Sequence, residues 1–255
     1  MPEGDTLART AAGLRPHLVG RPVTAASARA PGPRIERVVG ARVTGVEARG
    51  KHLLIRFDNG LEVRTHLRMH GSWHRYRPGE RWRRAPSRAR LVLEVPGSVA
   101  VCFDAPVVEL FEQRTEPLHP SLSRLGPDLL GDRVDVDEAV RRLRDPSRAG
   151  LPIAVALLDQ RALAGIGNEV KNEVLWQAGR SPFTPVREVE DSALRELVGR
   201  AIEILREGAA TGRRPRHVYR RAGRPCPRCG SIIRVEHQGA DVPRLTFWCP
   251  ACQRE

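Results

Sequence analysis

Four cysteines near the end of the chain have the spacing of a metal site. They form two C-x-x-C pairs, Cys226 with Cys229 and Cys249 with Cys252, with nineteen residues between the pairs. Each pair offers two thiolates from one tight turn, and four thiolates complete the tetrahedral shell that Zn²⁺ prefers. The alternative is a pair of disulfides or free thiols, and a reducing cytoplasm disfavours the disulfides. The spacing therefore predicts one structural zinc ion with no open position for catalysis.

A second group that could do chemistry lies at the start of the chain, where Pro2 and Glu3 follow Met1. A small residue in second place favours removal of Met1, which would expose Pro2 as a secondary amine. Because α-amino groups titrate near about pH 7.7–8.0, below the ~10.4 of lysine, such an amine can act as a nucleophile and form a Schiff base. The neighbouring Glu3 carboxyl can exchange protons. The alternative is an ordinary frayed terminus.

The segment AGIGNEVKNEVLW (164–176) places Gly165 and Gly167 directly before a predicted helix that starts near Asn168. Glycines allow backbone N–H groups to approach an anion, and the start of a helix attracts negative charge. One interpretation is a clamp for a DNA phosphate. The other is a simple turn, which Gly-x-Gly alone does not exclude.

The charge of the chain indicates a polyanionic partner. The 255 residues carry a formal net charge of +13, and residues 212–224 contain six arginines and no acid. Basic side chains bind phosphates by releasing counterions, although a solvated basic surface would have the same composition. Only two of the 43 basic residues are lysines, Lys51 and Lys171. Lysine can lose its proton, so a lysine among so many arginines can serve where arginine cannot.

The composition also indicates where the protein works. Hydrophobic residues make up 40% of the chain, which is enough to form a core. There is no apolar run of about eighteen residues and no apolar stretch typical of a secretory signal near the N-terminus. We therefore expect a cytoplasmic protein with no membrane partner.

The elements that must position these residues follow two patterns. The first part of the chain predicts one helix over residues 3–18 and then strands, with hairpin turns at Asn59-Gly60 and Pro96-Gly97. The second part has helical periodicity, with Asp and Asn placed as caps. The predicted strands are 52–57, 61–67, 90–95 and 99–103, and the predicted helices are 136–144, 152–160, 168–178 and 191–208.

This order predicts an α+β protein in three parts. Residues 1–118 are predicted to form a β-sandwich with a leading helix, residues 128–212 a helical domain, and residues 213–255 a basic linker and the cysteine-bearing hairpin. Phe247 and Trp248 are interpreted as core residues of that hairpin rather than base-stacking groups. Cys102, inside a predicted strand, is interpreted as a core thiol.

Together these features resemble the formamidopyrimidine-DNA glycosylase/endonuclease VIII family, from residue 2 to residue 253. The resemblance is specific because five segments occur in the same order. They are PEGDT (2–6), RGKHLL (49–54), THLRMHGSW (65–73), GIGNEVKNEVLW (165–176) and CPRCGSII…TFWCPACQ (226–253). The family implies a β-sandwich domain, a helix–two-turns–helix domain and a zinc-finger hairpin, which agrees with the arrangement expected from the residues alone.

The resemblance implies catalytic roles for three residues. Pro2 would be the Schiff-base nucleophile and Glu3 the proton-transfer group. Lys51 would be a cation near the damaged nucleotide and its phosphate. For Lys171 the resemblance gives no role, and we expect it at the surface.

The resemblance also implies a DNA-binding surface. Asn168 and Arg244 would grip the phosphate at the lesion, one from the helical motif and one from the finger. His66 resembles a further phosphate contact. Met69 would fill the gap left in the duplex when the damaged nucleotide flips out.

The activity implied is that of a bifunctional DNA glycosylase and abasic-site lyase that acts on damaged double-stranded DNA with β,δ-elimination. The zinc segment resembles endonuclease VIII, and DAPVVELF (104–111) lacks the Arg and Phe that the purine-acting branch inserts opposite the lesion. Oxidised pyrimidines are therefore favoured, although HLRMHGS (66–72) resembles the purine-acting branch. The alternatives are a purine-acting glycosylase and a DNA-binding relative that has lost the chemistry. We expect a monomeric, nucleoid-associated bacterial protein.

Overall fold

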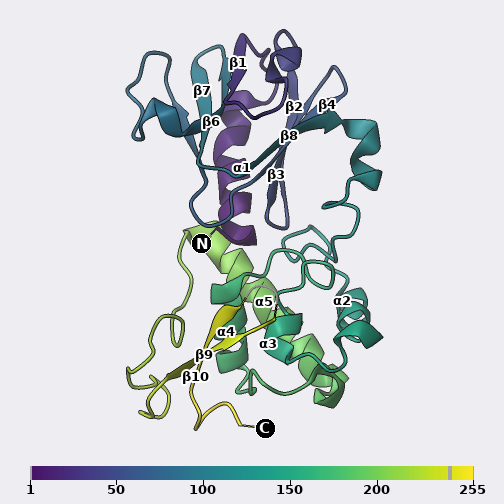
Figure 1. Cartoon of the computed structure of the whole chain (residues 1–255), viewed down its shortest axis with the longest axis vertical. Helices are drawn as coiled ribbons and strands as arrows, with labels where there is room; N and C mark the ends of the chain where they lie inside the picture. Colours follow the sequence, from purple (N-terminus) through teal and green to yellow (C-terminus); the bar gives the residue numbers. More distant parts are fainter. Residues whose placement is uncertain (1, 241–242, 255) are drawn as a thin grey trace. The chain divides into compact units, whose positions relative to one another are not determined.

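The computed structural model describes residues 2–240 and 243–254, which form two compact units (Figure 1). The first unit contains residue 2 and residues 6–124, and the second contains residues 3–5 and the described residues from 125 onward. Strands dominate the first unit and helices the second, so the predicted α+β class is confirmed. No helix of the described ranges is both long and apolar enough to cross a membrane.

Two four-stranded antiparallel sheets and helix α1 build the first unit. One sheet has the strand order β1-β6-β7-β5 and the other β2-β3-β4-β8. The elements are α1 (Gly4–Leu18), β1 (Ala25–Ala28), η1 (Ile35–Val38), β2 (Val43–Arg49), β3 (His52–Phe57), β4 (Leu61–His66), β5 (Ser72–Tyr76), η2 (Pro86–Arg88), β6 (Ala89–Val95), β7 (Ser98–Phe103), β8 (Val107–Glu112) and η3 (Gln113–Leu118).

The two predicted hairpins are confirmed. Gly60 and Gly97 have φ angles of 80° and 76°, which suit glycine in tight turns. The first turn sets a register that places Ile55 opposite Val63, and the second joins β6 to β7. Apolar side chains of both sheets share one core with α1, including the buried Leu7. Burying that much apolar area is the main force that stabilises this unit.

Helices and a two-stranded hairpin make up the second unit. Asp135 caps α2, because its carboxylate accepts the N–H of Glu138. Helix α5 extends beyond its predicted end to Thr211, and Gly212 terminates it with a φ of 74°. The elements are α2 (Val136–Leu143), η4 (Pro146–Arg148), α3 (Ile153–Ala156), α4 (Asn168–Gln177), η5 (Val186–Glu188), α5 (Asp191–Thr211), β9 (Arg234–Gln238) and β10 (Arg244–Trp248).

The predicted helix over residues 152–160 is wrong beyond Ala156. The carboxylate of Asp159 accepts the backbone N–H of Arg161 at 2.9 Å and pairs with the Arg148 guanidinium at 2.7 Å. Such local side-chain bonds compete with helix formation. The segment therefore turns toward Gly165 after a single helical turn.

Helix α4 is buried along its length, from Asn168 to Trp176. Val170 and Val174 join the core of the helical bundle, whereas Trp176 packs in a separate core with the hairpin residue Phe247. Phe247 and Trp248 are only 6% and 7% exposed, so their predicted core role is confirmed. The polar side chains of α4 must consequently find partners inside the protein.

Candidate active site

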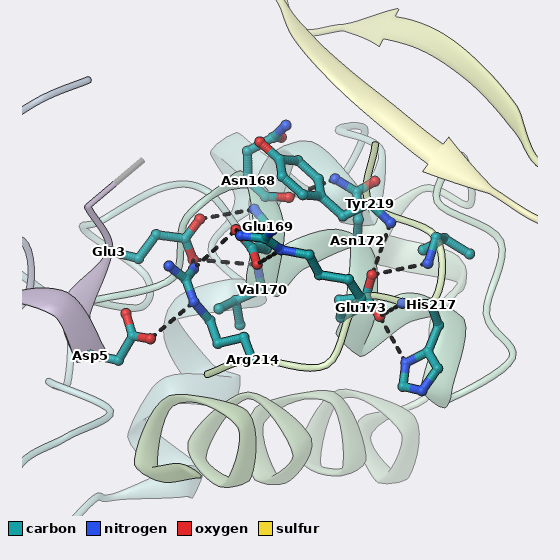
Figure 2. Close-up of polar contacts among 12 residues, drawn as sticks. Glu3, Asp5, Asn168, Glu169, Val170, Asn172, Glu173, Arg214, His217 and Tyr219 are labelled. Carbon is teal, nitrogen blue, oxygen red and sulfur yellow. Dashed lines mark hydrogen bonds and ion pairs between the residues drawn. The ribbon is translucent and has the colours of Figure 1, made fainter. Parts of the chain in front are cut away.

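The buried carboxylate of Glu3 lies at the start of α4 (Figure 2). Its oxygens accept the backbone N–H of Gly167 at 3.2 Å, of Glu169 at 2.9 Å and of Val170 at 3.3 Å. The first N–H groups of a helix have no partner within the helix, and the helix dipole favours an anion there. Glu3 therefore satisfies three donors, and the donors favour its ionised form.

This contact corrects the interpretation of the glycine-rich segment as a phosphate clamp. The anion at the start of α4 is the Glu3 carboxylate, so those N–H groups already have a partner. Asn168 is the first residue of the helix and not its cap, because Gly167 holds the cap position. Glu3 and Gly167 are 164 residues apart in sequence, so no local pattern could indicate their contact.

Glycines allow residues 3–5 to approach this site so closely. A Cβ on Gly167 would lie 2.2 Å from the carboxyl carbon of Glu3, and a Cβ on Gly208 would lie 2.2 Å from Asp5 Oδ2. The N–H of Gly4 donates to the carbonyl of Gly165 at 3.0 Å. The glycines of the N-terminal motif and of the helical motif therefore serve one and the same contact.

Arg214, from the basic linker, also lies beside Glu3 (Figure 2). Its Nη1 lies 3.0 Å from Glu3 Oε2 and 3.7 Å from Glu169 Oε2, and its Nε lies 3.0 Å from Asp5 Oδ2. Arg216 forms a further ion pair with Glu169 at 2.7 Å. These two linker arginines thus neutralise acids of the protein itself, whereas the composition indicated an external polyanion.

Glu173 anchors the linker to α4. Its carboxylate, which is fully buried, accepts the backbone N–H groups of His217, Val218 and Tyr219 at 2.8–3.0 Å (Figure 2). The His217 ring stacks on Trp176 with centroids 4.3 Å apart. Glu173 was not among the residues predicted for the site. One signal in the sequence could have indicated this role. The acids of this helix alternate with apolar residues that a core would bury, and a buried acid needs a partner inside the protein.

Side chains on one face of α4 hold strand β10. Asn168 Nδ2 donates to the carbonyl of Leu245 at 2.9 Å, and the backbone N–H of Phe247 donates to Asn172 Oδ1 at 2.6 Å. Asn168 and Asn172 are one helical turn apart, which places both against the strand. Arg244, predicted to act with Asn168, directly precedes Leu245. The two predicted phosphate ligands therefore lie on elements joined by hydrogen bonds.

The expectation that Lys171 lies at the surface is wrong. Its side chain is 1% exposed, and its Nζ donates to Thr246 Oγ1 at 2.8 Å and to the carbonyl of Leu245 at 3.4 Å. Burial lowers the pKa of Lys171 to about 7; the negative charge of Glu3 opposes this, and the positive charge of Arg244 adds to it. An arginine in this position would not lose its proton.

Three predicted site residues lie in the first unit, around the end of β4. Lys51 is half-buried in the turn between β2 and β3, and His66 is the last residue of β4. Burial, followed by the charges of Arg64 and Lys51, lowers the pKa of His66 to about 4, so the ring is neutral near pH 7. Met69 is 47% exposed between β4 and β5. Such exposure suits a side chain that inserts into DNA.

Pro2 is half-buried and directly precedes Glu3 in the chain. It belongs to the first unit, with Lys51, His66 and Met69, whereas Glu3, Asn168 and Arg244 belong to the second. The described contacts bring Glu3 and Asn168 to the same helix start. Pro2 is linked to this group of residues by its peptide bond to Glu3.

The predicted metal ligands come together at the base of the hairpin. The Sγ atoms of Cys226, Cys229, Cys249 and Cys252 all lie within 4.8 Å of one another, so these residues could hold one metal ion. The indole Nε1 of Trp176 donates to Cys226 Sγ at 3.4 Å, which links the cluster to α4.

Cys102 lies apart from this cluster, fully buried in β7. Burial raises the pKa of the Cys102 thiol, in keeping with a core thiol and not a nucleophile.

Two protein-family models match the chain. The model of the formamidopyrimidine-DNA glycosylase N-terminal domain matches residues 1–106, and the model of the H2TH domain of the same glycosylase matches residues 125–218. Together they cover more than half of the sequence.

Named relatives are similar over nearly the whole chain. "Probable endonuclease 8 2" of Streptomyces coelicolor is 42% identical over 264 residues, which cover 99% of this chain and 94% of that protein. "DNA-(apurinic or apyrimidinic site) lyase Nei2" of Mycolicibacterium smegmatis is 39% identical, with 99% of both covered. "Endonuclease 8" of Escherichia coli is 32% identical, with 99% of this chain and 100% of that protein covered.

Solved structures share the fold. The MutM (Fpg) protein of Thermus thermophilus superposes with a TM-score of 0.83 at 30% identity, covering 99% of this chain and 98% of that one. Lactococcus lactis Fpg, in complex with DNA that contains N7-benzyl-Fapy-dG, superposes with a TM-score of 0.85 over the full length of both chains. At 23% identity, the second likeness shows the fold alone.

Replacing Gly167 with Ala should dislodge Glu3, because the added Cβ would lie 2.2 Å from its carboxyl carbon. We expect the free energy of unfolding to fall by about 2–4 kcal/mol, as buried hydrogen bonds and an ion pair are lost. Urea denaturation followed by tryptophan fluorescence measures this. The control is Gly199→Ala in α5, where the added Cβ meets nothing within 4 Å. This variant should raise the free energy of unfolding by about 0.5–1 kcal/mol, because Ala favours a helix more than Gly does. Equal stability of Gly167→Ala and the wild type would contradict the geometry.

The lowered pKa of Lys171, about 7, makes stability depend on pH in a defined direction. Between pH 7 and the ordinary pKa of lysine, ~10.4, the unfolded chain binds a proton that the folded chain does not. Wild-type stability should therefore rise with pH relative to Lys171→Met, by about 2 kcal/mol between pH 7 and pH 9. Thr246→Val removes an acceptor but no titrating group, so it should keep the wild-type slope. Parallel slopes for wild type and Lys171→Met in urea titrations would show that Lys171 stays protonated.

Proposed function

This chain belongs to the formamidopyrimidine-DNA glycosylase family, and we propose that it removes oxidised pyrimidines from double-stranded DNA with Pro2 as its nucleophile. It is a DNA glycosylase and abasic-site lyase of base excision repair. The assignment of the catalytic residues is supported above all by the buried Glu3 carboxylate. Three backbone N–H groups and Arg214 hold this carboxylate in place, and Pro2 directly precedes Glu3 in the chain.

The proposed chemistry begins with removal of Met1, which lies outside the described residues. The secondary amine of Pro2 then attacks C1′ of the damaged nucleotide; the C1′–N bond forms, the glycosidic bond breaks, and the base leaves with a proton. The nitrogen then loses its own proton, and the C1′–O4′ bond opens as O4′ takes up a proton, which gives an iminium between Pro2 and C1′. The resulting iminium withdraws electrons from the sugar. Loss of a C2′ proton then expels the 3′ phosphate, and a second elimination expels the 5′ phosphate. A one-nucleotide gap with phosphate ends remains.

Glu3 is suited to proton transfer in this sequence. Its contacts with the start of α4 favour the carboxylate, which can accept a proton from the sugar and return it. The side chain is fixed by packing against Gly167, so little reorganisation precedes the reaction. Lys51 would supply a cation near the phosphate of the damaged nucleotide.

The proposed DNA contacts use both units. A base must leave the stack before its glycosidic bond is reached, at a cost of a few kcal/mol. Asn168 and Arg244 would grip the phosphate at the lesion, from two elements that hydrogen bonds at Leu245 hold together. His66 would donate to a phosphate as a neutral ring. Met69 would enter the gap in the duplex.

We propose that the four-cysteine cluster binds Zn²⁺. Tetrahedral coordination with Zn–S bonds of about 2.3 Å places sulfur atoms about 3.8 Å apart. Here Cys226 and Cys252 are 4.0 Å apart, and Cys229 and Cys249 are 3.4 Å apart. Four thiolates close the coordination shell, so the ion would stabilise the finger while no catalytic step uses it.

The preference for pyrimidines is supported by residues 104–111. Asp104 forms ion pairs with Arg84 and Arg88, and β8 then continues the sheet beside β4. This segment carries no arginine, and Phe111 lies inside β8, paired with Glu62. A loop that inserts Arg and Phe opposite the lesion, as implied for the purine-acting branch, therefore has no counterpart here. We propose that the protein acts as a monomer in the cytoplasm, at the nucleoid.

Pro2→Gly and Glu3→Gln should each lower the excision rate about 100-fold or more, because they remove the cyclic amine and the proton acceptor. The assay measures strand cleavage of a thymine-glycol duplex under single-turnover conditions. Affinity for a duplex with a tetrahydrofuran abasic analogue should change little. Glu207→Gln, an exposed carboxylate on α5, is the matched control. Wild-type cleavage by both variants would refute the mechanism, whereas a wild type that binds but never cleaves would indicate the inactive relative.

Cys249→Ser should release the metal and weaken DNA binding at least about tenfold, because a structural zinc site stabilises its finger directly. Elemental analysis should find one zinc per wild-type chain and none in this variant. Cys102→Ala, outside the cluster, should retain full zinc content. One zinc per chain together with unchanged affinity in Cys249→Ser would overturn the finger assignment.

A further inference from the structure

We infer that Arg214 is a positioning residue for Glu3, so that the basic linker is part of the active site as well as a connection between α5 and the finger. The inference rests on the proposed role of Glu3. The resemblance to the family implied no role for Arg214, and the sequence placed it in a basic linker.

The linker arginines differ in their surroundings. Arg214 has a side chain that is 11% exposed and contacts three buried or nearly buried acids, Glu3, Asp5 and Glu169. The side chain of Arg216, two residues later, is 62% exposed and contacts Glu169 but not Glu3. An arginine that served DNA binding would present its guanidinium to solvent, as Arg216 does. Arg214 instead directs its guanidinium into the protein.

Two anchors fix the path of the chain that carries Arg214. Before it, Gly212 ends α5 in a left-handed conformation, and the Thr211 hydroxyl accepts the N–H of Arg213 at 3.1 Å. After it, Glu173 accepts the N–H groups of residues 217–219. Only a few residues separate the anchors, so the guanidinium has little freedom to leave Glu3.

Electrostatics explains why a cation is needed at this position. Glu3, Asp5 and Glu169 approach the same guanidinium, and like charges this close disfavour one another's ionisation. Arg214 is the side chain that pairs with all three. Other charges near Glu3 are Lys171 on α4 and, beyond Glu169, Arg216 on the linker. Lys171 titrates near pH 7, whereas Arg214 keeps its charge throughout.

Asp5 gives the arrangement its geometry. It approaches the backbone of α5 at Gly208, and its Oδ2 pairs with Arg214 Nε while Nη1 lies 3.0 Å from Glu3 Oε2. A guanidinium is planar and rigid, so fixing its Nε edge also fixes where Nη1 lies. Lysine in this position would supply charge without that orientation.

The test compares Arg214→Met with Arg216→Met, which removes the same charge from the linker without touching Glu3. In ¹H–¹⁵N spectra, the amides of Glu169 and Val170 report protonation of the Glu3 carboxylate that they donate to. Arg214→Met should raise the midpoint of this titration by about one pH unit or more, because an opposite charge in contact is lost. Arg216→Met should leave the midpoint at the wild-type value, and Arg214→Lys should restore it in part.

Catalysis gives a second readout. In Arg214→Met, the acid limb of the pH profile for excision of thymine glycol should shift to higher pH, by the same amount as the amide midpoint. In Arg216→Met the acid limb should stay at the wild-type pH. Should Arg214→Met not fold, Arg214→Gln removes the charge and keeps hydrogen bonding, and the same comparison applies. An unchanged amide midpoint in a folded Arg214 variant would overturn the inference. A shifted midpoint in a protein whose wild type excises nothing would uphold it and refute the proposed function.

Discussion

The contact between the Glu3 carboxylate and the first N–H groups of α4 constrains much of the second unit. A buried carboxylate is unfavourable unless donors surround it, and here the start of a helix and one guanidinium supply them. The close approach of Glu3 to α4 and of Asp5 to α5 requires glycines, because side chains at positions 167 and 208 would occupy the same space as these two carboxylates. The N-terminal and helical motifs, far apart in sequence, are therefore two halves of one structural requirement.

Helix α4 extends this principle along its length. Its polar side chains hold two segments: Glu169 and Glu173 hold the linker, while Asn168, Lys171 and Asn172 hold strand β10. Hydrogen bonds between buried polar groups make an arrangement specific, since displacing one element leaves its partner unpaired. The helix thereby connects the proposed proton-transfer group, the proposed phosphate ligands and the cysteine cluster, which Trp176 contacts. Rigid support of this kind suits the proposed role of the site in holding opened DNA.

The sequence predicted what depends on local geometry and missed what depends on distant partners. The hairpins at Gly60 and Gly97 and the cap at Asp135 were predictable because turn and cap chemistry involves neighbouring residues. The cysteine cluster was predictable because its ligand spacing reflects the coordination of one ion. The helix after Pro152 was overestimated, since Asp159 diverts the chain through its own side-chain bonds. Burial of Lys171 and the pairing of Arg214 with Glu3 arise only in the folded protein. Lys171 was expected at the surface, and the charge of the basic linker indicated a polyanionic partner.

The most direct test of the account is borohydride reduction of the wild-type protein mixed with duplex DNA that carries thymine glycol or an abasic site, followed by proteolysis and mass spectrometry. Borohydride converts a Schiff base into a stable bond, so the adduct marks the nucleophile. The account predicts a single adduct on the peptide that begins with Pro2, without Met1. Lys51 and Lys171 are the only lysines of the chain, so few other amines compete. An adduct on either lysine, or none from protein shown to lack Met1, would contradict it.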